Sequence, residues 1–228
     1  MSPATTIPAL PALDWTSPKT WGIGAVRGPG LTLPYPVSYR DLHHDTTVAA
    51  ELLGRMGLSR GGLLLMIAGG AEWAQTAAYE RACTRLGAVW APAMPLPHDA
   101  YRVEMFLRRF TFQAVFGITP WILDGLEAEQ HDLAKVFGGV PTLIARPGAW
   151  ERLRAAGLSP WRLHALGPLL AFEPPGESAL LYDASDWAVE AQGGQLVVTS
   201  RASRACAVVR LPTGVKGSVD GGRVVVAS

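Results

Sequence analysis

The sequence has only two cysteines and no cluster of charge of one sign, and both absences restrict the kind of protein it encodes. Cys83 and Cys206 lie far apart among small or apolar neighbours, which favours reduced thiols in the core of a cytoplasmic protein over a disulfide framework. The 20 Lys and Arg residues nearly balance the 19 Asp and Glu residues, so the formal net charge is only +1. Because the basic residues are scattered, we expect no nucleic-acid partner.

A long hydrophobic run is missing as well. The first residues, "MSPATTIPALPALDW", have neither a basic start nor a sustained apolar segment. The sequence therefore predicts no signal peptide, no transmembrane helix and no membrane partner, and the prolines within residues 1–36 indicate an extended lead-in. The 228 residues are 49% hydrophobic and 17% charged, which is typical of a globular protein that needs neither a disulfide nor a metal for stability.

Residues 37–146 alternate strand patterns with helix patterns. The apolar run "GGLLLMIAGG" is bracketed by glycines, which is typical of a strand buried on both faces of a parallel sheet. A helix begins near Ser38, which forms a loose capping box with Asp41, and Gly57 and Gly87 indicate two helix ends. The other predicted elements are helices at "AEWAQTAAYERACTRLG" and "PHDAYRVEMFLRRF" and strands at "AVWAPAMP" and "FQAVFGI". This alternation predicts βαβ units in a layered α/β domain.

Residues 147–228 are richer in strand patterns. Gly193-Gly194 and Gly221-Gly222 are turn signals between closely spaced apolar runs, which indicates a mainly antiparallel sheet. We expect a helix at "GAWERLRAAG" and strands at "GPLLAF", "SALLYDA", "WAVEAQ", "GQLVVTSR", "ACAVVRL" and "GRVVVAS". The predicted fold class is therefore α/β, with a layered βαβ amino-terminal part followed by a mainly antiparallel β part.

Two short motifs contain residues of functional sites without the spacing that such sites need. "HHD", His43–Asp45, offers metal-ligand types, but adjacent helical residues point about a quarter-turn apart and no third ligand follows, so we expect a solvated helix face. "GIGAVRG", Gly22–Gly28, lacks the spacing of a dinucleotide loop and is expected to be a plain loop. No serine lies in an elbow-like context, and the eight tryptophans are interpreted as core and interface anchors.

Five segments carry a family pattern in a fixed order. The first combines a Ser-Tyr-x-x-Leu helix start, a Gly-rich link into a strand, a Glu-Trp pair and a Gly-Ala-Val strand that ends in Pro, within "VSYRDLHHDTTVAAELLGRMGLSRGGLLLMIAGGAEWAQTAAYERACTRLGAVWAPAMP". The others are "LAKVFGGVPTLIAR" with "WERLRAAGLSPWRLHALG", then "AFEPPG", "LLYDASDWAVEA" and "GGQLVVTSRASRACAVVRLPTGV". Over most of residues 37–215, the sequence resembles the adenylate-forming superfamily, which contains the acyl-CoA synthetases and phenylacetate-CoA ligases.

The resemblance implies a shortened amino-terminal ligase domain with a residual nucleotide pocket. It assigns the ring of Tyr182 to adenine, Ser185 to a phosphate contact and Asp186 to Mg²⁺, with Glu173 and Thr213 in the same pocket. AMP or ATP with Mg²⁺ and a small carboxylic acid are the ligands that it implies.

Several residues depart from the family pattern. Asp183 and Asp186 replace the Gly and Glu of the Tyr-Gly-x-Thr/Ser-Glu motif, and no Ser/Thr/Gly-rich phosphate loop ending in Lys precedes "LAKVFGGVPT". In "RLPTGV", Val215 stands where the family has an Asp that accepts hydrogen bonds from ribose, and the loss of such a bond costs about 1.5–3 kcal/mol. We also expect the family's mobile domain with its catalytic lysine to be missing.

These departures lead us to expect a non-catalytic or catalytically impaired homologue that serves as a binding, regulatory or assembly subunit, with no catalytic residue. The alternatives are one half of a split ligase, an enzyme that uses Asp186, Glu173 and Tyr182 for other chemistry, and an unrelated α/β protein. The apolar segments "WILDGL" and "LLLMIAGGAEWA" would be covered in a homodimer or by a partner protein.

Overall fold

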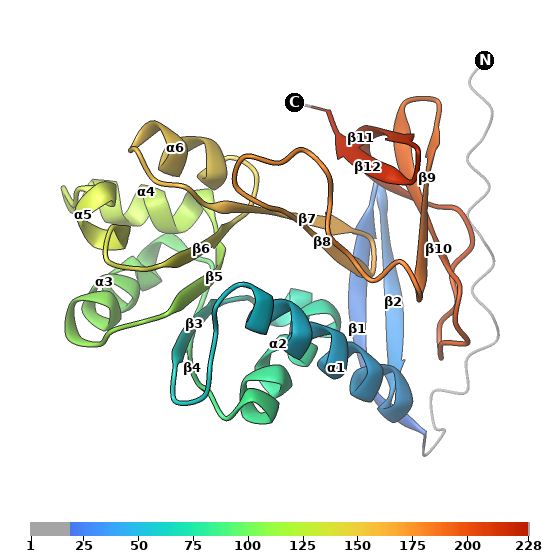
Figure 1. Cartoon of the computed structure of the whole chain (residues 1–228), viewed down its shortest axis with the longest axis horizontal. Helices are drawn as coiled ribbons and strands as arrows, with labels where there is room; N and C mark the ends of the chain where they lie inside the picture. Colours follow the sequence, from blue (N-terminus) through green and yellow to red (C-terminus); the bar gives the residue numbers. More distant parts are fainter. Residues whose placement is uncertain (1–18, 228) are drawn as a thin grey trace.

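The computed structural model of the chain describes residues 19–227, which form three sheets flanked by helices (Figure 1). Much of the predicted lead-in therefore lies outside the described residues. A six-stranded mixed sheet carries helices on both faces, and a two-stranded hairpin and a four-stranded antiparallel sheet lie beside it. The predicted α/β fold class, with a parallel first part and an antiparallel second part, is confirmed.

The six-stranded sheet has the order β4-β3-β5-β6-β7-β8, and within it only β8 runs antiparallel to its neighbour. Its strands are β3 (Leu63–Ile67), β4 (Val89–Ala93), β5 (Ala114–Ile118), β6 (Thr142–Ala145), β7 (Trp161–Leu166) and β8 (Leu169–Glu173). Leu64 and Met66 pack into one hydrophobic core, whereas Leu65 and Ile67 pack into a second core on the opposite face. The strand predicted from "GGLLLMIAGG" is therefore buried on both faces, as expected.

Two groups of helices cover the two faces of this sheet (Figure 1). The helices α1 (Tyr39–Arg55) and α2 (Trp73–Leu86) contribute to the first core, beside the hairpin. The second core contains residues of α3 (Ala100–Arg109), α4 (Pro120–Ala128), α5 (Leu133–Phe137) and α6 (Ala149–Ala155), and single 3-10 turns occur at Gly70–Glu72 and Pro97–Asp99. The first core borders the cavity described below.

Local signals set the start of α1 and the end of α2. The hydroxyl of Ser38 accepts a hydrogen bond from the backbone N–H of Asp41 at 3.1 Å, and the carboxylate of Asp41 accepts one from the backbone N–H of Ser38 at 3.0 Å. This reciprocal pair confirms the predicted capping box. Gly87 ends α2 in the left-handed conformation with φ 69°, as predicted from its position.

The four-stranded sheet has the order β12-β11-β10-β9 and is antiparallel throughout. Its strands are β9 (Trp187–Gln192), β10 (Gln195–Ser200), β11 (Leu211–Asp220) and β12 (Arg223–Val226). The two Gly-Gly pairs predicted as turns connect β9 to β10 and β11 to β12. These tight turns confirm the antiparallel prediction for this region.

Two strand predictions in this region are wrong. The segment "SALLYDA" makes only isolated bridges, between Leu181 and Phe172 and between Ala179 and Val225. The segment "ACAVVRL" forms a loop, and strand β11 starts only at its last residue. Cys206 and Val208 of this loop are buried, so its apolar pattern reflects burial of a loop against the core and not pairing in a sheet.

The expectation of a plain loop at "GIGAVRG" is also wrong, because this segment lies in strand β1 (Thr20–Gly28), which pairs with β2 (Leu31–Ser38). The glycines serve close packing. A Cβ atom on Gly22 would collide with the ring of Trp73, and one on Gly24 would collide with Ala74 of α2. Trp21 stacks on Trp73 with ring centroids 4.2 Å apart, which fixes the hairpin on α2.

The strands β7 and β8 lie after residue 146 but complete the same six-stranded sheet, so this sheet is not confined to residues 37–146. Both cysteines are free and buried, as predicted, and burial raises the pKa of the Cys83 thiol to about 12. No helix within residues 19–227 is long and apolar enough to cross a membrane.

The two apolar segments that were expected to meet a second chain lie mostly inside this one. Ile122 and Leu123 of "WILDGL" are fully buried, and so are Leu64 and Leu65 of the other segment. Trp121 is the exception, with 56% of its surface exposed. The homodimer therefore stays a prediction that these segments do not support.

Candidate functional site

A cavity of about 600 Å³ lies between α1, α2, the start of β8 and residues 180–187. Apolar side chains form much of its wall, among them Leu52, Ala78, Leu169, Leu170 and Leu180. Polar side chains line the cavity to a similar extent, among them His44, Asp45, Glu51, Arg55, Gln75, Asp183, Ser185 and Arg204. A cavity of this size lies in the range of small-molecule binding sites.

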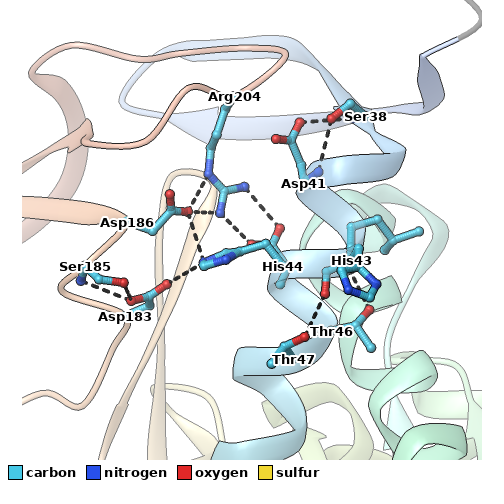
Figure 2. A network of polar contacts seen from close by, with 12 residues as sticks. Ser38, Asp41, His43, His44, Thr46, Thr47, Asp183, Ser185, Asp186 and Arg204 are labelled. Carbon is cyan, nitrogen blue, oxygen red and sulfur yellow. Dashed lines mark hydrogen bonds and ion pairs between the residues drawn. The ribbon is translucent and has the colours of Figure 1, made fainter.

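His44 of α1 meets the segment 183–186 at one end of this cavity (Figure 2). Its Nε2 lies 2.8 Å from Oδ2 of Asp183 and 3.9 Å from Oδ2 of Asp186. The other carboxylate oxygen of Asp183 accepts hydrogen bonds from the backbone N–H of Ser185 at 3.0 Å and from its hydroxyl at 2.6 Å. This local turn holds the Asp183 carboxylate in place, with Oδ2 facing the imidazole.

Arg204 pairs with two carboxylates next to His44 (Figure 2). Its guanidinium donates from Nε to Asp186 at 2.7 Å and from Nη1 and Nη2 to the two oxygens of Asp45 at 3.1 and 2.5 Å. Its Cζ lies 4.6 Å from the ring centroid of Trp187. The side chains of Arg204 and Asp186 are only 5% and 2% exposed, so these charges depend on each other.

The first turn of α1 fixes the loop that carries Arg204. The carboxylate of Asp41, which caps the helix through Ser38, also accepts a hydrogen bond from the backbone N–H of Ala205 at 3.0 Å. Asp45 follows one helical turn later and faces the guanidinium. A local capping signal thus also positions a segment that is distant in the sequence.

Burial and pairing change the pKa values of this cluster in different directions. Burial raises the pKa of Asp183, but hydrogen bonds from Ser185 and His44 outweigh it, so its pKa lies below the ordinary value. For Asp45, burial raises the pKa above the ordinary value although Arg204 opposes the change. Burial alone would lower the pKa of Arg204, but the hydrogen bonds and charges of its carboxylate partners outweigh burial. The pKa of Arg204 therefore lies above its ordinary value, and Arg204 remains charged. Asp183 is therefore ionised at neutral pH.

Three of the five site residues predicted from the sequence come together here. Tyr182 and Ser185 line the cavity, and the carboxylate of Asp186 lies next to them. Glu173 and Thr213 are absent from the cavity wall and have partners elsewhere.

Sequence reasoning did not assign His44, Asp45 and Arg204 to a site. The solvated face expected for "HHD" is wrong for Asp45, which pairs with the buried Arg204, and incomplete for His44, which is 44% exposed but contacts Asp183. Only His43 fits the expectation fully. The "HHD" motif contains two residues of the site, but their partners are distant in the sequence. Asp183, the partner of His44, lies 139 positions further along the chain, and Arg204, the partner of Asp45, lies 159 positions further.

Glu173 forms a separate polar cluster between β7 and β8. Its carboxylate lies 3.2 Å from Nε2 of His164 and 4.0 Å from Nη1 of Arg162. Arg162 also stacks on the ring of Trp150 at 4.8 Å and pairs with Glu151 at 3.0 Å. These contacts join β7 and β8 to α6, which indicates a structural role for Glu173.

We expect His164 to make the stability of the fold depend on pH. Burial lowers the pKa of His164 although Glu173 opposes the change, so the folded state holds the imidazole neutral at pH values where the unfolded chain takes up a proton. The free energy of unfolding should therefore fall as pH decreases below the unfolded pKa of about 6.5. Urea titrations between neutral and mildly acidic pH should show a weaker pH dependence for His164→Gln.

The exposed His98 provides the matched control, because His98→Gln should leave the pH dependence of the wild type unchanged. Equal pH dependence in His164→Gln and the wild type would contradict the assignment of His164.

Thr213 supports the second sheet. Its hydroxyl donates to the carbonyl of Leu196 at 2.8 Å and accepts from the backbone N–H of Val215 at 3.1 Å. Gly214 has φ 76°, and the β10–β11 register shifts at this point. "RLPTGV" is thus mainly an irregular part of strand β11, and Val215 packs against the core.

Asp186 does not offer the surroundings that Mg²⁺ prefers. Magnesium takes an octahedral set of oxygen ligands, whereas the groups nearest the Asp186 carboxylate are the guanidinium of Arg204 and the imidazole of His44. The guanidinium of Arg204, which is in hydrogen-bond contact with the Asp186 carboxylate, repels a divalent cation such as Mg²⁺. The residues present therefore do not fit the Mg²⁺ site that the resemblance implied.

Comparison with solved structures identifies the fold. An open conformation of 2-hydroxyisobutyryl-CoA ligase, in complex with 2-HIB-AMP and CoA, matches 91% of this chain and 55% of its own, with a TM-score of 0.69 and 16% identity. The o-succinylbenzoate CoA synthetase (MenE) of Bacillus subtilis matches 92% of this chain and 49% of its own (TM-score 0.58, 12% identity). For MbtA of Mycobacterium smegmatis, the shares are 90% and 45% (TM-score 0.57, 14% identity).

No protein-family model and no curated protein matches the sequence. At these identities the structural likeness establishes the fold, which is that of part of the adenylate-forming ligases, as the sequence resemblance predicted. The chain spans about half the length of the ligases that it matches.

Proposed function

We propose that this chain, which has the fold of about half of an adenylate-forming ligase, is a binding subunit that does not form acyl-adenylates by itself. In this proposal the cavity between α1, α2 and residues 180–187 holds a small ligand, and occupancy serves a regulatory or assembly role. The apolar residues of its wall, such as Leu52 and Leu169, suit the hydrocarbon part of a small acid or a related molecule.

The carboxylate of Asp183 is the observation that carries the proposal. Asp183 stands where the family pattern has glycine, and it accepts both hydrogen bonds that Ser185 donates to it. The hydroxyl assigned to a phosphate contact is therefore already used. A phosphate group next to Asp183 would also meet an ionised carboxylate, and two like charges about 4 Å apart repel by ~4 kcal/mol at an effective dielectric constant near 20.

Two further features support the proposal. Only residues 129–132 separate α4 from α5, and no glycine-rich loop between these helices offers backbone N–H groups to a triphosphate. Val215 provides no side-chain acceptor for ribose hydroxyls.

The purified chain is expected to release no pyrophosphate from ATP and Mg²⁺ with any of a panel of aryl and fatty acids. Calorimetry with AMP, ATP and a non-hydrolysable acyl-adenylate mimic should show no saturable binding of the free nucleotides. Turnover that depends on the added carboxylic acid would contradict the proposal, and a catalytically competent ligase run in parallel is the control for the assay.

Asp183→Gly and Asp183→Asn separate the reasons for weak nucleotide binding. If the charge of Asp183 excludes phosphate, both variants should bind AMP at least about tenfold more tightly than the wild type, which corresponds to ~1.4 kcal/mol. If its volume matters more, only Asp183→Gly should gain affinity. If neither variant binds AMP more tightly than the wild type, the carboxylate of Asp183 no longer supports the proposal.

The second candidate, one half of a split ligase, is favoured by one observation. The chain spans 45–55% of the length of the ligases compared above. This candidate predicts that pyrophosphate release begins when a second chain that carries a phosphate loop and a lysine domain is added. Assays of co-purified complexes distinguish it from the first candidate.

A further inference from the structure

We propose that the cavity between α1, α2 and residues 180–187 prefers an uncharged carbonyl compound with an apolar body, such as a primary amide or an ester, to a free carboxylic acid. This preference rests on the proposed function, because it names the class of ligand that the cavity would hold. Three features of the wall carry it: polar ring atoms without partners, charged groups that already have partners, and buried apolar side chains.

Two buried aromatic side chains bring unpaired polar atoms to the cavity. Tyr79 of α2 is 8% exposed, Trp187 at the start of β9 is 4% exposed, and both line the cavity. Neither the Tyr79 hydroxyl nor the Trp187 indole N–H has a hydrogen-bond partner in the described part of the chain. In that part, the side-chain atoms that are both unpaired and fully buried belong to Tyr35, Arg146 and Arg162. The polar atoms of Tyr79 and Trp187 therefore remain accessible, and the cavity is the space that these side chains line.

Tyr182 adds a second hydroxyl to the same wall. It is half-buried, lines the cavity and makes no hydrogen bond to any described residue. Burial raises the pKa of Tyr79 and that of Tyr182, so both hydroxyls keep their protons at neutral pH. A phenol can donate or accept a hydrogen bond, whereas an indole N–H can only donate. These groups therefore favour a ligand with oxygen acceptors, and a carbonyl oxygen can accept from two donors.

The charged groups at the other end of the cavity already have partners. Arg204 is paired with the carboxylate of Asp45. The carboxylate of Asp183 accepts a hydrogen bond from Ser185 at 2.6 Å and lies 2.8 Å from the imidazole of His44. A ligand that carries a charge would lose its hydration here without gaining an unpaired counter-charge. An uncharged ligand avoids this cost.

The remaining charged residues of the wall do not favour a carboxylate either. Glu51 and Arg55 are exposed and carry opposite charges one helical turn apart on α1. The wall holds more carboxylates than guanidinium groups, with Asp45, Glu51 and Asp183 against Arg55 and Arg204. The excess negative charge repels a carboxylate ligand and leaves the energy of a neutral amide nearly unchanged.

The apolar side chains of the wall suit the body of the ligand. Leu169, Leu170 and Leu180 are 5%, 7% and 6% exposed and line the same cavity. Each methylene or ring carbon placed against them leaves water, which favours binding. The cavity of about 600 Å³ can hold such a body together with the carbonyl group that faces the ring hydroxyls.

Matched pairs of an acid and its primary amide test the proposal, because the two members have the same size and differ in charge at neutral pH. The probes are phenylacetate with phenylacetamide, cinnamate with cinnamamide, and octanoate with octanamide. In ligand-observed NMR titrations of the full chain, at least one amide should saturate a single site and bind at least about tenfold more tightly than its acid.

Equal or tighter binding of the acids would overturn this preference, and the cavity would still be a ligand site. Binding of no probe at all would overturn it as well. Release of pyrophosphate from ATP with an added acid would instead contradict the proposed function, so the two failures are distinguishable.

Two variants assign the preference to the ring hydroxyls. Tyr79→Phe and Tyr182→Phe each remove one hydroxyl and keep the ring, so each should weaken amide binding about three- to tenfold. The affinity for the acid should change less, which narrows the difference between acid and amide. The matched control is Tyr35→Phe, because the Tyr35 hydroxyl is also unpaired but Tyr35 does not line the cavity. Unchanged amide binding in both cavity variants would overturn the proposal, as would an equal loss in Tyr35→Phe.

Discussion

Replacing Arg204 with alanine is expected to lower the free energy of unfolding by about 3–5 kcal/mol, because it leaves the buried carboxylate of Asp186 and the partly buried carboxylate of Asp45 without their cation. The variant also loses the contact between the guanidinium and the ring of Trp187. Urea denaturation at neutral pH measures the difference. The loss should shrink as the pH is lowered, since protonation removes the unpaired negative charges.

Arg152 provides the control for this experiment. It also pairs with two carboxylates, those of Asp124 and Glu127, but both are half exposed. Arg152→Ala should therefore cost no more than about 1 kcal/mol. Comparable losses in Arg204→Ala and Arg152→Ala would show that burial does not govern the pairing. Asp45→Asn and Asp186→Asn, added to Arg204→Met, should restore much of the stability, because no buried charge then remains unpaired.

Truncation of Phe172 to alanine is expected to cost about 3–5 kcal/mol of unfolding free energy. The side chain is fully buried on β8, and its ring centroid lies 5.8 Å from that of Tyr79 and 6.1 Å from that of Phe116. The substitution removes a ring that joins the six-stranded sheet to α2. Because Tyr79 lines the cavity, the variant should also bind any cavity ligand more weakly.

The same substitution at Phe110 is the matched comparison. Phe110 is 50% exposed, so Phe110→Ala should cost about 1 kcal/mol. Chemical denaturation of both variants under one condition gives the difference directly. A loss below about 1 kcal/mol in Phe172→Ala would contradict the role of the aromatic cluster between β8 and α2.

Binding of AMP to the wild type, with turnover of a carboxylic acid, would end the proposal of a non-adenylating subunit. The Asp183 variants then test separately whether this carboxylate excludes phosphate.

Much of the fold follows from short-range patterns. The capping box at Ser38, the glycine that ends α2 and the apolar run of β3 each depend on residues within one or two turns or one strand, so the sequence reveals them. The order of five weak segments was enough to predict the ligase fold that the solved structures share. Errors arose where apolar residues are buried for other reasons, as at Cys206 and Val208 in a loop.

Sequence alone thus determined the α/β class, the main helices and their caps, the buried thiols and the departures at Asp183 and Val215. Tertiary structure alone decided which polar groups meet. It brought His44 to Asp183 across 139 positions and assigned Glu173 to a separate cluster on β7 and β8. The physical reason is that caps and periodicity act through neighbouring residues, whereas the meeting of distant charged side chains depends on how whole helices and sheets pack.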